Sequence, residues 1–175
     1  MSTTFGNVCL ALVTLGVLTV MALATTNAAA AGSGEQQFVT QAAIGGMAEV
    51  EMGKLAVDKA SSPDVKKFAA QMISDHTKAD EELEKLATGK SLKVPTALDT
   101  EHKRKLERLS KKTGADFDKS YIQDQVSGHK KMQQLLAAEA TNGKDADLKM
   151  FAERTLPTVK QHYQMAKQIE AKVEK

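Results

Sequence analysis

The chain has 175 residues, 24 of them basic and 22 acidic, so its formal net charge of +2 is close to neutral. The two signs of charge are interspersed, which argues against a nucleic-acid-binding protein and against a polybasic membrane patch. Cys9 is the single cysteine and lies near the N-terminus. A mature chain without it has no disulfide and depends on its hydrophobic core for stability.

The N-terminal segment has the pattern of a secretory signal peptide. It carries no charged residue before Glu35, and an apolar stretch over residues 8–24 is followed by small residues at 28–32. An apolar segment followed by an A-x-A site is typical of a signal peptide. We therefore predict that residues 1–31 are cleaved off and that the protein is exported to the periplasm or envelope. The alternative is an uncleaved membrane anchor, for which the apolar run is shorter than the ~20 residues usually needed.

Helical periodicity runs through the rest of the chain, and strand signals are nearly absent. Apolar residues at steps of three and four predict a first helix over residues 35–60, followed by a short turn over 61–63. A second helix is predicted over 63–88. Pro63 suits its first position, where the missing N–H costs nothing, and Gly89 ends it.

The second half of the chain continues the helical pattern. We predict a loop over 90–97, a short amphipathic helix over 98–112 and two further long helices over 115–141 and 145–173. Pro157 lies inside the last helix, where a proline removes one backbone hydrogen bond and is expected to kink the helix.

The connections between these helices predict the topology. The turns at 61–63 and 142–144 are short, so each joins its two helices into an antiparallel hairpin. The 26 residues from 89 to 114 join the hairpins and are long enough to travel the length of a bundle, so the second and third long helices run parallel. We therefore predict that residues 35–175 form one all-α domain, a ferritin-like four-helix bundle. Its long crossover between helices 2 and 3 carries the short extra helix.

Each long helix places one residue of a metal-ligating type on its apolar stripe. In chain order these residues are Glu49, His76, His129 and His162. Four helices would thus direct one carboxylate and three imidazoles into the bundle, and bundle cores build metal sites from such convergence. Asp75 is adjacent to His76 and would orient its ring by a hydrogen bond. Imidazole-rich sites suit Zn, Cu, Fe or Ni, and the sequence does not choose among these ions.

Counting from the turns tests whether these residues share one level of the bundle. Glu49 lies 13 residues before Ser62 and His76 lies 14 after it. At a rise of ~1.5 Å per residue, the two side chains are level across the first hairpin.

The second hairpin is less regular. His129 lies 14 residues before Gly143, but His162 lies 19 after it, level with Asp124 instead. The mismatch is about 7 Å of helical rise. Two interpretations remain open here. One is a single site of the first three ligands, which His162 joins only through a kink at Pro157. The other is two smaller sites, in which Asp124 supports His162.

The same histidines also fit a role as hydrogen-bonded core residues that pair with inward carboxylates. The di-iron Glu-x-x-His signature is absent, because the residues three before the inward histidines are Ile73, Val126 and Val159. No nucleophile elbow or Gly-rich phosphate loop is present either, and we find no catalytic motif.

Three functional hypotheses follow from these residues. The first is an exported bundle that holds a transition metal ion in its core. The second is a metal-free periplasmic or envelope protein that acts in stress or through contacts with a second copy or an envelope partner. The third is a metal-dependent redox enzyme, which would need an open coordination position and a path for its substrate.

Four stretches of the sequence resemble one bacterial envelope family. They are FVTQAAIGGMAEVEMGKLAVDKA at residues 38–60, the Asp75-His76 pair, the stretch from Phe117-Asp118 to His129, and Thr155-Leu156-Pro157 leading to His162. The family is a ferritin-like domain of unknown function that is often labelled an outer membrane protein. The resemblance covers essentially the whole mature chain. It implies a ferritin-like bundle and export to the periplasm or envelope, and it carries no established activity.

Overall fold

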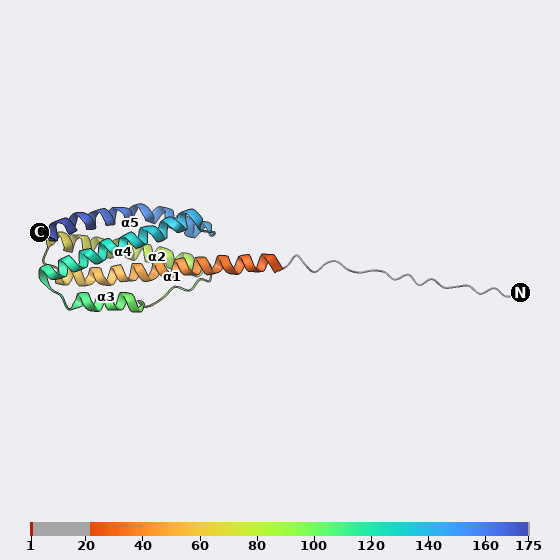
Figure 1. Cartoon of the computed structure of the whole chain (residues 1–175), viewed down its shortest axis with the longest axis horizontal. Coiled ribbons are helices and arrows are strands. Elements are labelled where there is room, and N and C mark those ends of the chain that lie inside the picture. The colour runs from red at the N-terminus through yellow and green to blue at the C-terminus, as the bar shows by residue number, and fades with distance from the viewer. Residues whose placement is uncertain (2–21, 175) are drawn as a thin grey trace.

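The computed structural model describes Met1 and residues 22–174, with side chains from Gly34 onward. All regular secondary structure in this part of the chain is helical. The helices are α1 (Ala22–Lys59), α2 (Pro63–Gly89), α3 (Thr100–Ser110), α4 (Gly114–Asn142) and α5 (Ala146–Val173). Figure 1 shows the four long helices packed side by side, with the short α3 along one side of the bundle. The predicted all-α fold is confirmed.

Helix α1 is longer than the sequence pattern indicated. It begins at Ala22, whereas the first helix was expected to start at Glu35. The added segment is rich in alanine, which has the highest helix propensity of all residues and needs no apolar stripe to continue a helix. The predicted signal peptide, residues 1–31, lies mostly outside the described residues, since only its last part falls within α1. None of the described helices is both long and apolar enough to span a membrane.

The parallel alignment of α2 and α4 is confirmed by a contact at one end of the bundle. Asp118, in the first turns of α4, accepts hydrogen bonds from the backbone N–H groups of Ser61 (3.1 Å) and Ser62 (2.8 Å). These serines form the turn before α2, so α2 and α4 start at the same end. At the opposite end Lys90 pairs with Asp145 (2.7 Å), which joins the end of α2 to the start of α5. This is the ferritin-like arrangement with one long crossover.

The turn between α1 and α2 is closed by a side chain of α4. Pro63 takes the first position of α2, as predicted, and the preceding Ser62 is the N-cap residue, but the Ser62 side chain makes no capping hydrogen bond with the described residues. Asp118 supplies the acceptor from α4 instead, and it also accepts a hydrogen bond from the Ser61 hydroxyl. A buried carboxylate with three donors is well satisfied, and this one ties the first hairpin to the second.

The crossover helix α3 lies alongside α1 and α4. Asp99 caps it by accepting a hydrogen bond from the His102 N–H (2.8 Å). Its one buried residue, Leu109, packs into the core. Arg108 holds the helix to α4 through two hydrogen bonds to the Asp124 carboxylate, at 2.9 and 2.7 Å. Helix α3 therefore covers the seam between α1 and α4.

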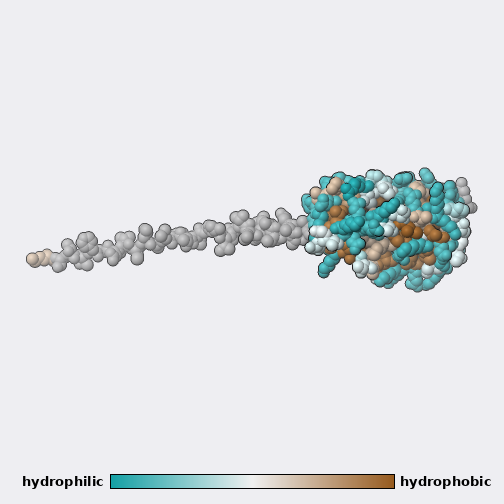
Figure 2. Space-filling view, turned by 180° about the vertical axis from the view of Figure 1, so that it is seen from behind, coloured by the Kyte–Doolittle hydropathy of each residue, from teal (hydrophilic) through white to brown (hydrophobic). Residues whose placement is uncertain are grey.

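The apolar core is divided into two clusters along the bundle axis. On α2, Met72 belongs to one cluster and Leu83 to the other; on α4 the corresponding residues are Ile122 and Leu136. Each inward histidine lies between the two clusters on its own helix. The outside is mostly hydrophilic on the face shown in Figure 2. A polar layer is therefore enclosed within an otherwise ordinary hydrophobic core.

Candidate metal centre

The polar layer contains five side chains that are nearly inaccessible to solvent. They are Glu49, His76, Gln125, His129 and His162. Burying such groups is costly unless each polar atom finds a partner, so their pairing decides what the layer does. Four of the five were expected from the sequence.

The three histidines face one another in the centre of the bundle. Their ring centroids are 5.4 to 5.7 Å apart. One ring nitrogen of each lies within 4.8 Å of the corresponding atoms of the other two. His76 comes from the first hairpin, whereas His129 and His162 come from the second. The structure therefore brings His162 to the other two histidines in a single cluster.

The tautomer of His129 follows from its neighbour on α4. Its Nδ1 lies 2.9 Å from the backbone carbonyl oxygen of Gln125, one helical turn earlier. A carbonyl oxygen only accepts, so Nδ1 carries the proton and Nε2 carries the lone pair. That Nε2 is buried and has no hydrogen-bond partner among the described residues. His129 thus presents an uncompensated lone pair inside the protein.

His162 shows the same arrangement with its two nitrogens exchanged. Its Nε2 lies 3.0 Å from Oδ2 of Asp75, on α2. An ionised carboxylate also only accepts, so the proton sits on Nε2 and the lone pair on Nδ1. This Nδ1 is likewise buried and without a partner in the described part of the chain. A carboxylate that holds the outer nitrogen of a histidine is the arrangement by which proteins orient metal-binding imidazoles.

His76 completes the cluster as a neutral imidazole. Burial, together with smaller contributions from the two neighbouring histidines, lowers its pKa from 6.5 to about 3. Burial also lowers the pKa of His162, although Asp75 opposes this shift. The Nε2 of His76 is the third buried ring nitrogen without a partner among the described residues. Neutral imidazoles are the form that binds metal ions, so protons do not compete for His76 at neutral pH.

Glu49 lies beside the cluster on the outer side of His129. Its Oε1 is 3.9 Å from Nδ1 of His129, the nitrogen already bonded to the Gln125 carbonyl. Its Oε2 accepts a hydrogen bond of 2.5 Å from Nε2 of Gln125. Burial raises the pKa of the Glu49 carboxyl, and His129 and Gln125 act against that increase. Glu49 is therefore adjacent to the three-histidine cluster and is not one of its members.

The convergence of His129 and His162 has a simple geometric cause. His129 lies 13 residues before the end of α4 and His162 lies 16 residues after the start of α5, so the offset measured from the helix ends is only about 4.5 Å. Side chains also tilt toward the N-terminus of their own helix. In this antiparallel pair the tilt moves His129 away from the turn and His162 toward it. The two rings therefore meet without a break in α5, which continues through Pro157.

Two expectations about the supporting carboxylates are wrong. Asp75 does not orient the adjacent His76, because consecutive residues are rotated by about 100° around a helix; it binds His162 instead. Asp124 does not support His162. It is five residues before His129 and faces α3, where Arg108 binds it. The interpretation with two smaller sites therefore fails.

Gln125 is the residue that the sequence analysis missed. It supplies the carbonyl for His129 and the amide for Glu49. Its position four residues before His129, on the same face of the helix, was the available signal. Backbone carbonyl acceptors carry no signature in a sequence, so the bond between the Gln125 carbonyl and His129 could be found only from coordinates.

The donor set fits a transition metal ion. Nitrogens bound at ~2.0–2.1 Å in a tetrahedral site lie ~3.4 Å apart, so a small contraction of the cluster would close it on an ion. Imidazole is a ligand for Zn, Cu, Fe and Ni, and the three ring nitrogens without a partner among the described residues are the atoms such an ion would use.

These features define a class of protein, a ferritin-like four-helix bundle with a buried three-histidine layer. The sequence profile of a domain of unknown function, DUF4142, matches residues 20–169, and the chain belongs to this family. No curated protein matches the chain significantly.

Solved structures of similar fold come from other proteins. A DUF305 fragment from Deinococcus radiodurans aligns with a TM-score of 0.70 and 10% identity, over 79% of this chain and 96% of that chain. CopM in the Cu(II)-bound form gives a TM-score of 0.67 and 18% identity over 79% and 96% of the two chains. CopM in the Cu(I)-bound form gives 0.65 and 20% over 77% and 93%. At these identities the similarity establishes the shared helical-bundle fold.

Proposed function

We propose that this protein is an exported bundle that binds a transition metal ion through His76, His129 and His162. The observation that carries the proposal is the set of three buried ring nitrogens without hydrogen-bond partners among the described residues. In two of these rings the other nitrogen is held by a protein acceptor, which leaves the lone pair toward the core. Two orphaned acceptors beside a third unpartnered ring nitrogen are costly for a purely structural core, and a metal ion satisfies all three nitrogens.

Copper is the ion we favour. For a given set of nitrogen ligands, affinity among divalent ions rises to a maximum at Cu(II) and falls again at Zn(II). CopM, which has a similar fold, has been solved with Cu(I) and with Cu(II), which supports the choice without deciding it.

Metal analysis of the purified protein tests this function. Metal-free protein exposed to equal amounts of Cu(II), Zn(II) and Ni(II) should retain one equivalent of metal, predominantly copper. His76→Ala and His129→Ala should each lose most of the binding. Stoichiometric metal in the variant that carries both substitutions would contradict the proposal. A wild-type protein that takes up none of these ions would do so too, and the histidines would then be structural elements of an envelope interaction protein.

The supporting carboxylate offers a matched pair of variants. Asp75→Asn should weaken the affinity for Cu(II) by about 10- to 100-fold, because it removes the group that holds the outer nitrogen of His162. Asp124→Asn removes a carboxylate of the same type that binds Arg108 instead, and it should leave the affinity unchanged. Titration calorimetry of the two variants separates a specific effect from a general loss of charge.

Export is supported by the sequence of residues 1–31 and by the position of the core. The buried side chains that the structure describes begin at Phe38, so cleavage after residue 30 or 31 removes none of them. Intact-mass measurement on protein from the native membrane fraction and periplasm should find a chain that begins at Ala31 or Gly32. A membrane-bound species that retains Met1 would contradict export by cleavage.

A further inference from the structure

An ion that reaches the histidine cluster must cross a packed helical wall. The three histidines are at most 7% exposed, so direct transfer from solvent is blocked. A chamber of about 340 Å³ lies between α1, α4 and the start of α3, and its walls include both His76 and His129. Its outer part is formed by residues of the α3 start and by the exposed Lys131. The chamber therefore connects the surface to two of the three proposed ligands.

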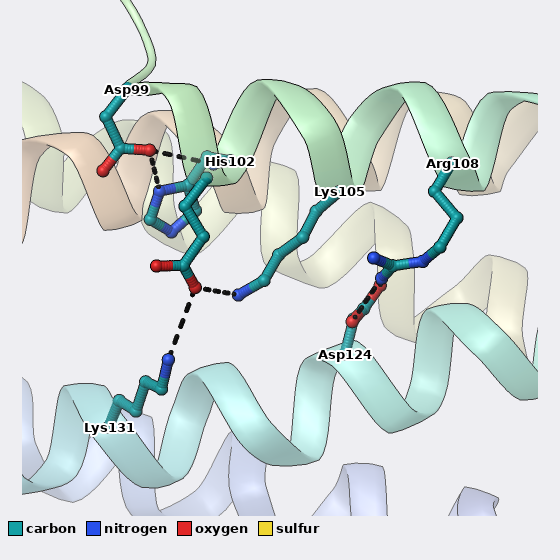
Figure 3. A network of polar contacts seen from close by, with 7 residues as sticks. Asp99, His102, Lys105, Arg108, Asp124 and Lys131 are labelled. Carbon is teal, nitrogen blue, oxygen red and sulfur yellow. Dashed lines mark hydrogen bonds and ion pairs between the residues drawn. The ribbon is translucent and has the colours of Figure 1, made fainter.

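His102 lines this chamber at its outer side. Its Nδ1 lies 2.8 Å from Oδ1 of Asp99, the same carboxylate that caps α3. Figure 3 shows the His102 ring directly below Asp99, and Glu101 is paired with Lys105 and Lys131 nearby. The carboxylate places the proton on Nδ1 and leaves Nε2 with the lone pair. This repeats the arrangement of Asp75 and His162 at a position that solvent reaches.

Glu49 lines the same chamber at its inner side. Burial raises the pKa of its carboxyl, while His129, Gln125, His102 and Lys105 oppose the increase. The carboxylate oxygen lies 3.9 Å from the His129 ring, so it stands next to the end of the path.

We propose that this chamber is the access route for the metal ion, with His102 as the outer ligand and Glu49 as the relay to the histidine cluster. The inference rests on the proposed metal-binding function and adds the path to it. At the mouth the Glu101 carboxylate is paired with Lys131 and Lys105, so the group we assign to capture the ion is Nε2 of His102, which Asp99 leaves with the lone pair.

Gly45 lines the chamber and leaves room for the Met132 side chain. A Cβ atom added at this position would lie 2.5 Å from the terminal methyl of Met132, another residue of the chamber wall. A leucine at this position would fill space inside the route. Position 45 is not one of the three proposed ligands, so the substitution should change the barrier to passage more than the bound state.

Stopped-flow mixing of the metal-free full-length protein with Cu(II), followed by absorbance, tests the route. His102→Ala should slow uptake by about 10-fold or more, as expected when a charged or ligating group that guides association is lost. Its equilibrium affinity should stay within about 2-fold of wild type, since rates and affinities separate when only the path changes. Gly45→Leu should slow uptake and release together. Arg108 binds Asp124 of α4 and does not line the chamber, so the control variant Arg108→Gln should keep the wild-type rate of uptake.

The outcomes distinguish the route from the function. Wild-type rates in both His102→Ala and Gly45→Leu, with normal affinity, would overturn the route and leave the metal site in place. An affinity loss in His102→Ala as large as its rate loss would also overturn it, because His102 would then belong to the final site. If wild-type protein binds no Cu(II), both proposals fall. Should Gly45→Leu not fold by circular dichroism, His102→Ala decides the question alone.

Discussion

Burial governs the protonation of individual side chains in this protein. It lowers the pKa of His76 to about 3 and raises the pKa of Asp80, on the same helix, to about 7. Both shifts favour the neutral form, as expected for groups taken out of water. For His76 the neutral form is also the one that binds a metal ion. For Asp80 it means that the carboxyl is ionised only near and above neutral pH.

Asp80 should make stability depend on pH. A carboxyl whose pKa is raised by folding stabilises the native state below its unfolded pKa of 3.8, and this contribution is lost as pH rises through about 7. Asp80→Asn keeps the shape and cannot ionise. It should therefore be more stable than wild type at pH 8, by about 1–2 kcal/mol once partial exposure is taken into account, and show little difference at pH 4. Urea unfolding at both pH values measures this, with the exposed Asp58→Asn as control. An equal effect at both pH values would contradict it.

At the scale of the elements, two adjacent glycines in α1 allow its neighbours to approach closely. Each glycine in mid-helix costs about 1 kcal/mol relative to alanine, so its presence needs a compensating contact. The Asp80 carboxylate of α2 occupies the space where a side chain at Gly46 would begin, and the Met132 methyl of α4 does the same at Gly45. The pair thus sets the distance of α1 from α2 and from α4 at the level of the polar layer.

Gly46→Ala should accordingly destabilise the protein although it raises helix propensity. The added methyl would displace the short Asp80 side chain, and overpacking of this kind costs about 1–3 kcal/mol. Gly34→Ala in the same helix meets nothing within 4 Å and should be neutral or stabilising by up to about 1 kcal/mol. Thermal unfolding of the two variants compares them directly. A gain in stability for Gly46→Ala would show that α1 and α2 do not approach as closely as described.

At the scale of the whole molecule, the two hairpins are joined at both ends and in the middle. Asp118 ties the first hairpin to α4, and Lys90 ties it to the start of α5. Between these ends, His76 of the first hairpin meets His129 and His162 of the second. A metal ion bound there would cross-link the hairpins at the point where the apolar core is interrupted.

Metal binding should therefore raise the stability of the whole bundle. An ion that binds only the folded protein stabilises it by about 2.7 kcal/mol at a free concentration of 100 times the dissociation constant. Cu(II) should raise the Tm of wild-type protein in a concentration-dependent way, and EDTA should reverse the increase. The His76→Ala, His129→Ala double variant is the control and should show no shift. An equal shift in that variant would place the ion elsewhere on the protein.

The sequence by itself determined the elements and their order. Apolar periodicity, Pro63, Gly89 and the short turns predicted the long helices to within a few residues, except at the start of α1. The length of the crossover predicted the parallel pair, and the apolar stripes predicted which histidines point inward. These features are local, because a period of 3.6 residues and a turn residue leave their mark within a few positions of the chain.

Only the tertiary structure decided which inward groups meet. Counting along helices gives a level on the bundle axis, but a step of one residue turns the side chain by about 100° and its tilt shifts it further along the axis. For this reason Asp75 binds His162 and leaves the adjacent His76, and Asp124 binds Arg108 outside the core. The Gln125 carbonyl, which orients His129, belongs to the backbone and leaves no trace in the residue types. Pairing across helices depends on rotation and packing, which are properties of the assembled bundle.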